Sequence, residues 1–172
     1  MEEAKEVVKV NHPYKKQCVI RKLREDETEL LRDFLYEAIF VPEGTEPPER
    51  NIIELPELSV YTEHFGEYAD DHCLIADVEG RAVGAVWVRI MNDYVHVDDE
   101  TPSLAISLYP EYRGRGIGTQ LLNNMLDLLK KQGYRKVSLS VQKANYAVNL
   151  YLAAGFRIRK ESDEEYLMVC RL

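Results

Sequence analysis

The sequence lacks the features that define several common classes of protein. It has only three cysteines, Cys18, Cys73 and Cys170, with no Cys-x-x-Cys pair among them. Their odd number and wide spacing predict reduced, mostly buried thiols rather than a disulfide framework. No apolar run approaches the roughly 18 residues that span a bilayer, and no charged-then-apolar leader follows Met1, so we expect a cytoplasmic protein with no membrane partner. The four histidines show no ligand spacing, and no metal site is expected.

The sequence also has fewer basic residues than acidic residues. The chain has 22 Lys and Arg residues against 30 Asp and Glu residues, which gives a formal charge of −8 at pH 7. Because affinity for nucleic acid depends on clustered Lys and Arg, we expect no nucleic-acid partner. The charge is uneven, however: residues 109–145 hold 7 basic and 2 acidic side chains, whereas residues 43–79 hold 11 acidic side chains and 1 Arg.

What the chain does contain is typical of a globular protein. Hydrophobic residues make up 45% of the sequence, and its aromatic residues are 11 Tyr, 4 Phe and 1 Trp. A length of 172 residues suits one domain with a sizeable core. We therefore expect a single domain over residues 1–172, in which residues 1–16 form a polar N-terminal arm.

Hydrophobic periodicity predicts a mixture of strands and helices. Helical spacing of apolar residues predicts helices over residues 30–40, 56–65, 117–132 and 146–153. Strands are expected at residues 18–23, 73–78, 82–90, 104–108, 136–141, 156–160 and 166–171. The run from Asp26 to Glu29 has the form of a capping box for the first helix. Glu79 and Gly80 form a tight turn between two of the strands, and Asn145 precedes the last helix as an N-cap.

The most informative segment joins the strand at residues 104–108 to the helix at residues 117–132. We call it the glycine loop, and its residues are Arg113, Gly114, Arg115, Gly116, Ile117, Gly118 and Thr119. Such a junction presents unpaired backbone N–H groups and the positive end of a helix dipole to a ligand. Glycines remove the Cβ atoms that would keep a ligand's oxygens away from those groups. The loop therefore predicts a site for a phosphate or pyrophosphate.

Two familiar phosphate-binding loops do not fit this spacing. A nucleoside-triphosphate loop ends in Gly-Lys-Ser/Thr, and the chain has no Gly-Lys dipeptide. A dinucleotide fingerprint that starts at Gly114 needs a third glycine where Thr119 stands, and it belongs in an N-terminal βαβ unit. The remaining alternative is a glycine-rich turn that binds nothing.

Residues 104–156 resemble the GCN5-related N-acetyltransferase (GNAT) family. Arg113, Gly116 and Gly118 match its acyl-CoA signature, Arg/Gln-x-x-Gly-x-Gly/Ala, and residues 150–156 match its Leu-Tyr-x-x-x-Gly-Phe run. The resemblance implies an α/β fold of the GNAT type, a central mixed, mostly antiparallel twisted sheet of about six to seven strands flanked by about four helices. It also implies an acetyl-CoA-dependent N-acetyltransferase that needs no metal.

The resemblance assigns residues to the cofactor as well. The amides of the glycine loop would hold the CoA pyrophosphate. The pantetheine arm would lie in a V-shaped gap between the two central strands and pair with the backbone at Ile106 and Leu108, where an amide would also polarise the thioester carbonyl. Asn145 resembles the family's cofactor-contacting Asn, although it could equally be a helix cap, and the two roles are compatible.

Tyr151 resembles the family's tyrosine that protonates the departing thiolate. The reference pKa values of a phenol and a thiol are about 10 and about 8.5, so this proton transfer is modestly uphill before the site tunes it. The alternative is a tyrosine that only packs its helix against the core.

The general base is where the chain departs from the family pattern. Many relatives carry a Glu on or just before the strand that precedes the signature, whereas residues 102–109 contain no acid. The nearest acids are Asp98, Asp99 and Glu100. We take Glu100 as the candidate, although each of the three could be a solvated turn residue.

The sequence leaves the amine acceptor open. The resemblance places Phe40, Tyr61, Trp87 and Tyr109 in or near the segments that form the acceptor site. Both a small amine metabolite and a peptide or protein amine fit, and a homodimer is compatible with the sequence. A non-catalytic alternative is a CoA-binding regulatory or interaction module, which the missing strand acid favours and the retained Tyr151 disfavours.

Overall fold

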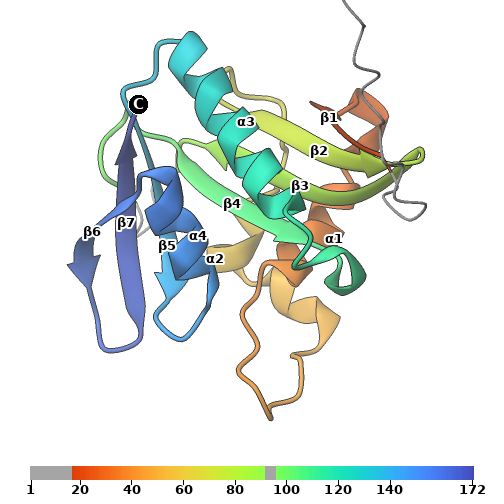
Figure 1. Ribbon diagram of the computed structural model, residues 1–172, viewed down its shortest axis with the longest axis horizontal. Helices are drawn as coiled ribbons and strands as arrows, with labels where there is room; N and C mark the ends of the chain where they lie inside the picture. Colours follow the sequence, from red (N-terminus) through yellow and green to blue (C-terminus); the bar gives the residue numbers. More distant parts are fainter. Residues whose placement is uncertain (1–16, 92–95) are drawn as a thin grey trace, which may run out of the picture.

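A computed structural model describes residues 17–91 and 96–172 of the chain, so the expected N-terminal arm lies outside the described residues. The described residues form strands, α-helices and short 3-10 helices (η) in an alternating order (Figure 1). In chain order these are β1 (Cys18–Lys22), η1 (Glu25–Glu27), α1 (Leu30–Glu37), η2 (Arg50–Glu54), α2 (Pro56–Ser59), β2 (His72–Val78), β3 (Arg81–Arg89), β4 (Ser103–Leu108), η3 (Pro110–Tyr112), α3 (Ile117–Lys131), β5 (Lys136–Gln142), α4 (Ala147–Ala154), β6 (Arg157–Glu161) and β7 (Glu165–Arg171).

The strands form one mixed sheet of the expected kind. Its order is β1-β2-β3-β4-β5-β7-β6, with seven strands among the described residues. Each neighbouring pair is antiparallel except β4 and β5, which are parallel. This parallel pair stands at the centre of the sheet and shares a single register pair, Ser103 with Ser138. Beyond that pair the two strands separate, because they have no further ladder to hold them together.

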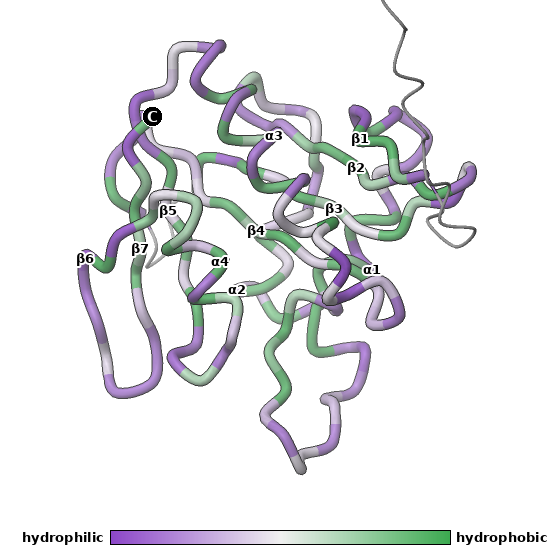
Figure 2. The backbone as a smooth tube through the Cα atoms, in the orientation of Figure 1, coloured by the Kyte–Doolittle hydropathy of each residue, from purple (hydrophilic) through white to green (hydrophobic). Residues whose placement is uncertain are grey.

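Both faces of the sheet are covered, and the alternation of side chains decides which residues serve each face. Figure 1 shows α3 lying across the strands, and α3 and α4 pack on one face. Helix α1 and η2 pack on the opposite face. In β2, for example, Leu74 and Ala76 face α3, whereas Cys73 and Ile75 belong to the cluster under α1. Figure 2 shows the hydrophobic colouring concentrated along the strands and the hydrophilic colouring at the outer turns.

Two helical segments end earlier than their apolar spacing predicts, and an arginine contacts the chain at or just after each end. Helix α1 stops at Glu37 instead of residue 40, and Arg113 donates to the Glu37 carbonyl (3.2 Å). The segment expected as a helix over residues 56–65 is helical only to Ser59. There the buried Arg89 donates to the carbonyls of Val60 (2.9 Å) and Glu63 (2.7 Å).

The capping interaction before α1 is also displaced from its expected position. The side chain that bonds back to the chain is that of Glu27, which accepts a hydrogen bond from the Arg24 amide (3.0 Å). The box therefore closes around η1, and Glu29 makes no side-chain cap. The tight turn is confirmed: Glu79 and Gly80 have φ values of 54° and 86°, and the Gly80 amide donates to Asp77 Oδ1 (2.7 Å). All three cysteines are free thiols, with Cys73 and Cys170 buried and Cys18 half-buried.

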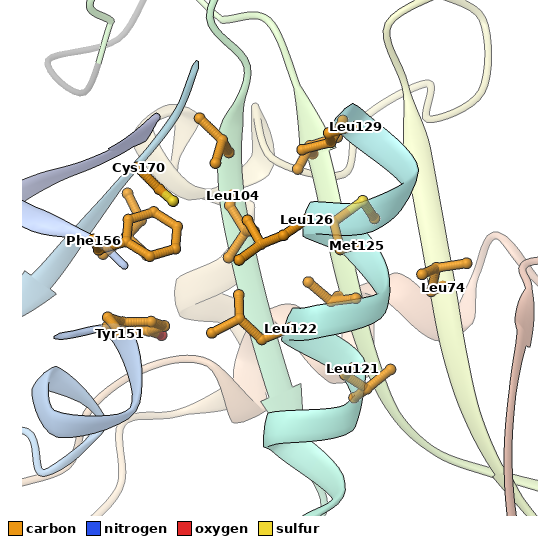
Figure 3. Close-up of a cluster of buried hydrophobic side chains, with 14 of the residues drawn as sticks. Leu74, Leu104, Leu121, Leu122, Met125, Leu126, Leu129, Tyr151, Phe156 and Cys170 are labelled. Carbon is orange, nitrogen blue, oxygen red and sulfur yellow. The ribbon is translucent and has the colours of Figure 1, made fainter. Parts of the chain in front are cut away.

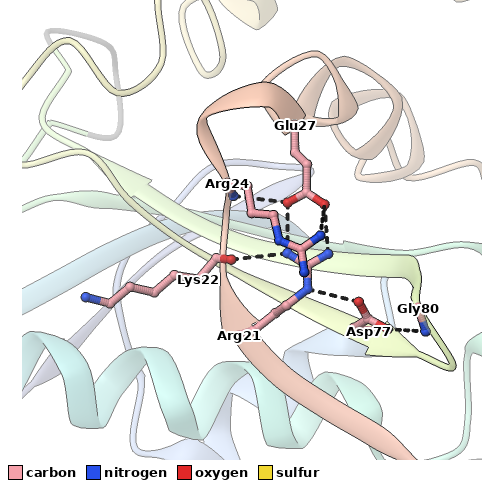
Figure 4. A network of polar contacts seen from close by, with 6 residues as sticks. All are labelled: Arg21, Lys22, Arg24, Glu27, Asp77 and Gly80. Atoms are coloured by element: carbon pink, nitrogen blue, oxygen red, sulfur yellow. Dashed lines mark hydrogen bonds and ion pairs between the residues drawn. The ribbon is translucent and has the colours of Figure 1, made fainter.

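Glu27 also belongs to a polar network that ties η1 to the edge of the sheet (Figure 4). Both Arg21 Nη atoms donate to its carboxylate at 2.8 Å, while Arg21 Nε donates to Asp77 Oδ2 at 2.9 Å. These bonds lower the pKa of Glu27 from its ordinary 4.5 to about 2, with the Arg21 hydrogen bonds as the main cause. Charge-assisted bonds of this kind, shielded from water, contribute measurably to stability.

We expect Glu27→Gln to lower the free energy of unfolding at pH 7 by about 1 to 2 kcal/mol. Because the folded pKa is depressed, the carboxylate contributes this stability above about pH 4.5 and loses it as the pH falls toward 2. Urea unfolding at pH 7, 4 and 3 should therefore show the variant approaching the wild type in acid. A difference that stays constant with pH would contradict this account. Glu25→Gln, an exposed change in the same 3-10 helix, should alter stability by less than about 0.5 kcal/mol.

Candidate active site

The glycine loop follows η3 and leads into α3, the longest helix among the described residues. Gly114 and Gly116 have φ values of +72° and +82°, a backbone conformation that L side chains rarely adopt. No atom lies within 4 Å of where a Cβ would stand on either residue, so the space beside the backbone is open. Gly116 is the N-cap of α3, and the first helical bond of α3 runs from the Gln120 amide to the Gly116 carbonyl (3.2 Å). The amides of Ile117, Gly118 and Thr119, in the first turn of α3, therefore have no helical acceptor and are available to a ligand, whereas the Arg113 amide donates to the Pro110 carbonyl (3.2 Å).

The gap between β4 and β5 begins where their single register pair ends. Tyr109 donates its amide to the Val83 carbonyl (2.9 Å), so the odd-numbered residues of β4 bond toward β3. Even-numbered residues must face the other way, because the bonds of an antiparallel ladder alternate. The bond from the Ser138 amide to the Pro102 carbonyl (3.0 Å) agrees with this direction. The backbone groups of Ile106 and Leu108 therefore face the gap, in the arrangement that the resemblance assigns to the pantetheine arm.

Tyr151 lies on α4 beside this gap. Its ring packs edge-on against Phe156, with centroids 5.8 Å apart, and the residue is only 8% exposed. Figure 3 shows its hydroxyl on the side that faces β4. Among the described residues no hydrogen bond is found for this hydroxyl. Burial raises the pKa of Tyr151 well above that of a free phenol, so its proton stays in place at neutral pH. The side chain of Tyr151 thus directs a protonated hydroxyl group toward the gap.

Two polar residues near the loop are engaged by the protein itself. The N-cap of α4 is Tyr146 rather than the expected Asn145. Asn145 stands one residue earlier, and its Oδ1 accepts a hydrogen bond from the Ala147 amide (2.9 Å). Its side-chain NH2 remains the group that would donate to a cofactor. The Arg113 guanidinium donates through Nε to the Leu108 carbonyl (3.1 Å) and through Nη2 to Glu37. The loop's first arginine therefore contacts α1 on one side and the end of β4 on the other.

Glu100 lies at the opposite end of β4 from the glycine loop. It is exposed in the turn before the strand, where its amide donates to Asp98 Oδ1 (2.9 Å). Asp98 itself accepts from Lys136 Nζ (2.9 Å) and Thr101 Oγ1 (2.7 Å), which lowers its pKa. Asp98 is therefore a structural residue of this turn, and the assignment of Glu100 as the base stays a prediction.

Three of the four acceptor candidates, Tyr61, Trp87 and Tyr109, belong to the cluster on the α1 face of the sheet. Trp87 is buried and donates its Nε1–H to the Tyr61 carbonyl (3.0 Å), so it helps to fix the position of the Tyr61 backbone. Tyr109 is half-buried at the end of β4, with its ring 5.1 Å from that of Phe34 and the Arg81 guanidinium over it at 5.4 Å. Phe40 is half-buried just after α1.

Two residues that support the site were not singled out by the sequence. Gly84 in β3 faces Leu108, and a Cβ on Gly84 would lie 2.1 Å from Leu108 Cδ2 and 2.9 Å from the Ser107 carbonyl. A glycine in the middle of a strand is the signal that could have found it, because such glycines often mark a close approach. The other is Glu37 on α1, which the structure brings to Arg113 from 76 positions away.

Other features of the described residues lie away from this site. A hollow of about 510 Å³ opens at the ends of β1 and β2, and its lining includes Lys22 and His72 rather than the glycine loop. The described residues contain no group of three or more His, Cys, Asp or Glu side chains placed to hold a metal ion. None of their helices has the length and apolar character needed to cross a bilayer.

Comparison with known proteins matches residues 29–156 to the Acetyltransferase (GNAT) family. An N-alpha-acetyltransferase of Sulfolobus acidocaldarius is 32% identical over 128 residues, which cover 65% of this chain and 75% of that protein. A probable N-acetyltransferase, camello, of Xenopus tropicalis is 34% identical over 86 residues, which cover 48% of this chain and 37% of that protein. The chain thus spans about a third of the camello protein and three quarters of the archaeal one.

The fold agrees with solved structures. The paia N-acetyltransferase of Thermoplasma acidophilum, crystallised in complex with coenzyme A, has a TM-score of 0.65 at 22% sequence identity. The match covers 91% of this chain and 99% of that chain. At this identity the likeness establishes the shared architecture, including the mostly antiparallel sheet and its flanking helices.

Proposed function

Because this chain belongs to the acetyltransferase (GNAT) family, whose cosubstrate is acetyl-CoA, we propose that it transfers an acetyl group from acetyl-CoA directly to a primary amine, with both substrates bound together. The observation that carries this proposal is the position of Tyr151. Its hydroxyl faces β4 beside the gap that opens after the Ser103–Ser138 pair. The pyrophosphate would bind the glycine loop at the end of this gap, and the thioester would lie within it.

In the proposed reaction, the amine attacks from one side of the gap and the thiolate is protonated from the other. The amine lone pair attacks the thioester carbonyl carbon, the C–N bond forms, and the C–S bond breaks. The departing thiolate takes the proton of Tyr151, and the attacking nitrogen loses a proton to water or to a base. Burial raises the pKa of Tyr151 and makes it a weaker acid. The same apolar surroundings would raise the pKa of a bound thiol as well, so the two shifts act in the same direction. With Tyr151 on the α4 side, the amine approaches from the face that carries α1.

The lack of an acid on β4 favours one class of amine. A lysine-like amine has a pKa of about 10.4, so only roughly one molecule in two thousand is neutral at pH 7, which costs about 4.6 kcal/mol. An α-amino group has a pKa of about 7.7 to 8.0, and the corresponding cost is about 1 kcal/mol. Glu100, exposed in its turn, would reach either amine only through water. We therefore propose that the preferred acceptor is the α-amino group of a peptide or protein, in line with the name of the archaeal relative.

The test is thiol release from acetyl-CoA in the presence of two kinds of acceptor. One set contains short peptides with a free N-terminus, and the matched set contains small diamines and N-terminally blocked lysine peptides. We expect thiol release with the free N-terminal peptides, confirmed by a mass increase at the α-amino group. The rate at low peptide concentration should rise with pH up to about 8 and then level off, because the amine is neutral above its pKa.

Each other outcome has a definite meaning. Faster release with lysine side chains or diamines, rising toward pH 10, would replace the α-amino assignment and keep the acetyltransferase. Tight binding of CoA without thiol release for any amine would favour the non-catalytic binding module. Absence of CoA binding would overturn both.

A further inference from the structure

Arg113, the first residue of the family signature in this chain, is held by three hydrogen bonds. Its Nε donates to the Leu108 carbonyl (3.1 Å), and its Nη2 donates to both the carbonyl (3.2 Å) and the Oε2 atom (3.0 Å) of Glu37. Two of these acceptors are backbone atoms at fixed places, the end of β4 and the last turn of α1. A planar guanidinium can hold both at once because its donors point in a rigid fork.

The last turn of α1 is tied to β4 a second time. The buried Ser107 hydroxyl donates to the Phe34 carbonyl (2.6 Å). The Phe34 carbonyl also accepts the Ala38 amide at the end of the helix (2.9 Å), so the Ser107 hydroxyl is its second donor. The C-terminal end of a helix carries partial negative charge, so the Arg113 cation is a favourable partner for the Glu37 carbonyl. Helix α1 is thus docked on the strand whose backbone faces the gap. The ion pair is partly open to water, since the Glu37 side chain is 19% exposed and the Arg113 side chain is 41% exposed.

Two roles for Arg113 are compatible with these contacts, and they predict opposite effects on CoA binding when Glu37 is changed. As a phosphate ligand, Arg113 would have to leave three acceptors to reach the pyrophosphate, and Glu37 would be a competitor for it. As a fixed brace, Arg113 would keep the glycine loop in position while only the loop's amides touch the phosphates. In the first case the loss of the Glu37 carboxylate strengthens CoA binding, and in the second it weakens it.

We propose that Glu37 is a positioning residue that acts through Arg113: it fixes the guanidinium between α1 and β4 and so holds the glycine loop in the conformation that receives CoA. This inference rests on the proposed use of the loop by CoA. It also makes α1, on the acceptor face, a part of the cofactor site's support. The sign of the effect is the informative quantity, because removing a negative charge near an anionic ligand would by itself favour binding.

The experiment measures CoA binding to folded protein by calorimetry, together with steady-state kinetics. Glu37→Gln should weaken CoA binding about tenfold, as expected for the loss of one charge-assisted bond. Its kcat at saturating acetyl-CoA should stay within about twofold of the wild type, since Glu37 touches no reacting atom. The matched control is Glu54→Gln, which removes the ion pair between Glu54 of η2 and Arg32 of α1, the helix that also carries Glu37. This variant should leave CoA binding unchanged.

Two further variants keep the proposal testable if the first is poorly folded. Arg113→Lys retains the charge but not the fork, so it should lose binding about as much as Glu37→Gln does. The double variant Glu37→Gln with Arg113→Gln should lose little more CoA affinity than either single variant, because both changes remove the same contact between Glu37 and Arg113. Unchanged or tighter CoA binding by folded Glu37→Gln, full binding by Arg113→Lys, or additive losses would each overturn the proposal. CoA binding by the wild type tests the proposed function separately, and Gly116→Val tests the loop assignment.

Discussion

Replacing Gly116 with valine should lower the affinity for CoA by at least roughly 100-fold. The residue has a φ of +82°, and a β-branched side chain is strained there. The valine methyl groups would also fill the open space beside the backbone, where the pyrophosphate oxygens are expected to meet the amides. Hydrogen bonds to a charged acceptor are worth about 1.5 to 3 kcal/mol each, so the loss of two accounts for an effect of this size. Calorimetric titration with CoA measures it.

The control separates this local blocking from backbone strain. Gly44 lies in an exposed turn between α1 and η2 with a φ of +80°, and no atom stands within 4 Å of its missing Cβ. Gly44→Val therefore introduces the same strain outside the glycine loop. Both variants should lose similar thermal stability, whereas only Gly116→Val should lose CoA. Equal CoA affinity in Gly116→Val and the wild type would show that the glycine loop is not the pyrophosphate site.

Tyr151→Phe should lower kcat by roughly 100-fold, the usual contribution of a positioned general acid. Phenylalanine fills nearly the same volume and keeps the edge-on contact with Phe156, so the core around α4 should remain intact. Affinity for CoA should change by no more than about twofold, because the hydroxyl acts on the departing thiolate rather than on the bound phosphates. Steady-state kinetics with an excess of acetyl-CoA, together with a CoA titration, measure both quantities.

Tyr146→Phe is the matched control, since Tyr146 is the N-cap of the same helix and is 72% exposed. It should leave kcat unchanged. The pH dependence gives a second check: burial raises the pKa of Tyr151, so the acid stays protonated beyond the usual range of a phenol. The wild-type kcat should not fall through ionisation of this residue below about pH 10. Undiminished turnover in Tyr151→Phe would assign the residue to packing alone.

Long, strongly periodic segments could be located from the sequence alone. The helix expected at residues 117–132 is α3 (Ile117–Lys131), and the hairpin with Glu79 and Gly80 at its turn is present. These elements depend on apolar spacing and turn chemistry within a few residues of one another. The ends of α1 at Glu37 and of α2 at Ser59 could not be placed, because apolar spacing continues past both residues and does not itself mark where a helix stops.

The candidate site divides in the same manner. The glycine loop, Asn145 and Tyr151 are recognisable from short motifs, since each motif carries its own backbone geometry. Glu37 carries no local signal, because its significance comes from Arg113, 76 positions along the chain. Gly84 is marked only as a glycine within a strand, and its reason, the 2.1 Å that would separate a Cβ from Leu108, exists only after β3 and β4 have paired.

By itself, the sequence determined the fold class and the resemblance to the family, and it predicted an anion-binding loop, because hydrophobic period, glycine placement and motif spacing are local properties. The low cysteine content and the short supply of positive charge, with its local excess over residues 109–145, were equally readable. Only the tertiary structure decided that β4 and β5 separate after one register pair, that Tyr151 faces β4 beside this gap, and that Arg113 braces α1. Each of these depends on contacts between residues far apart in the chain, which form when the sheet and its helices pack together.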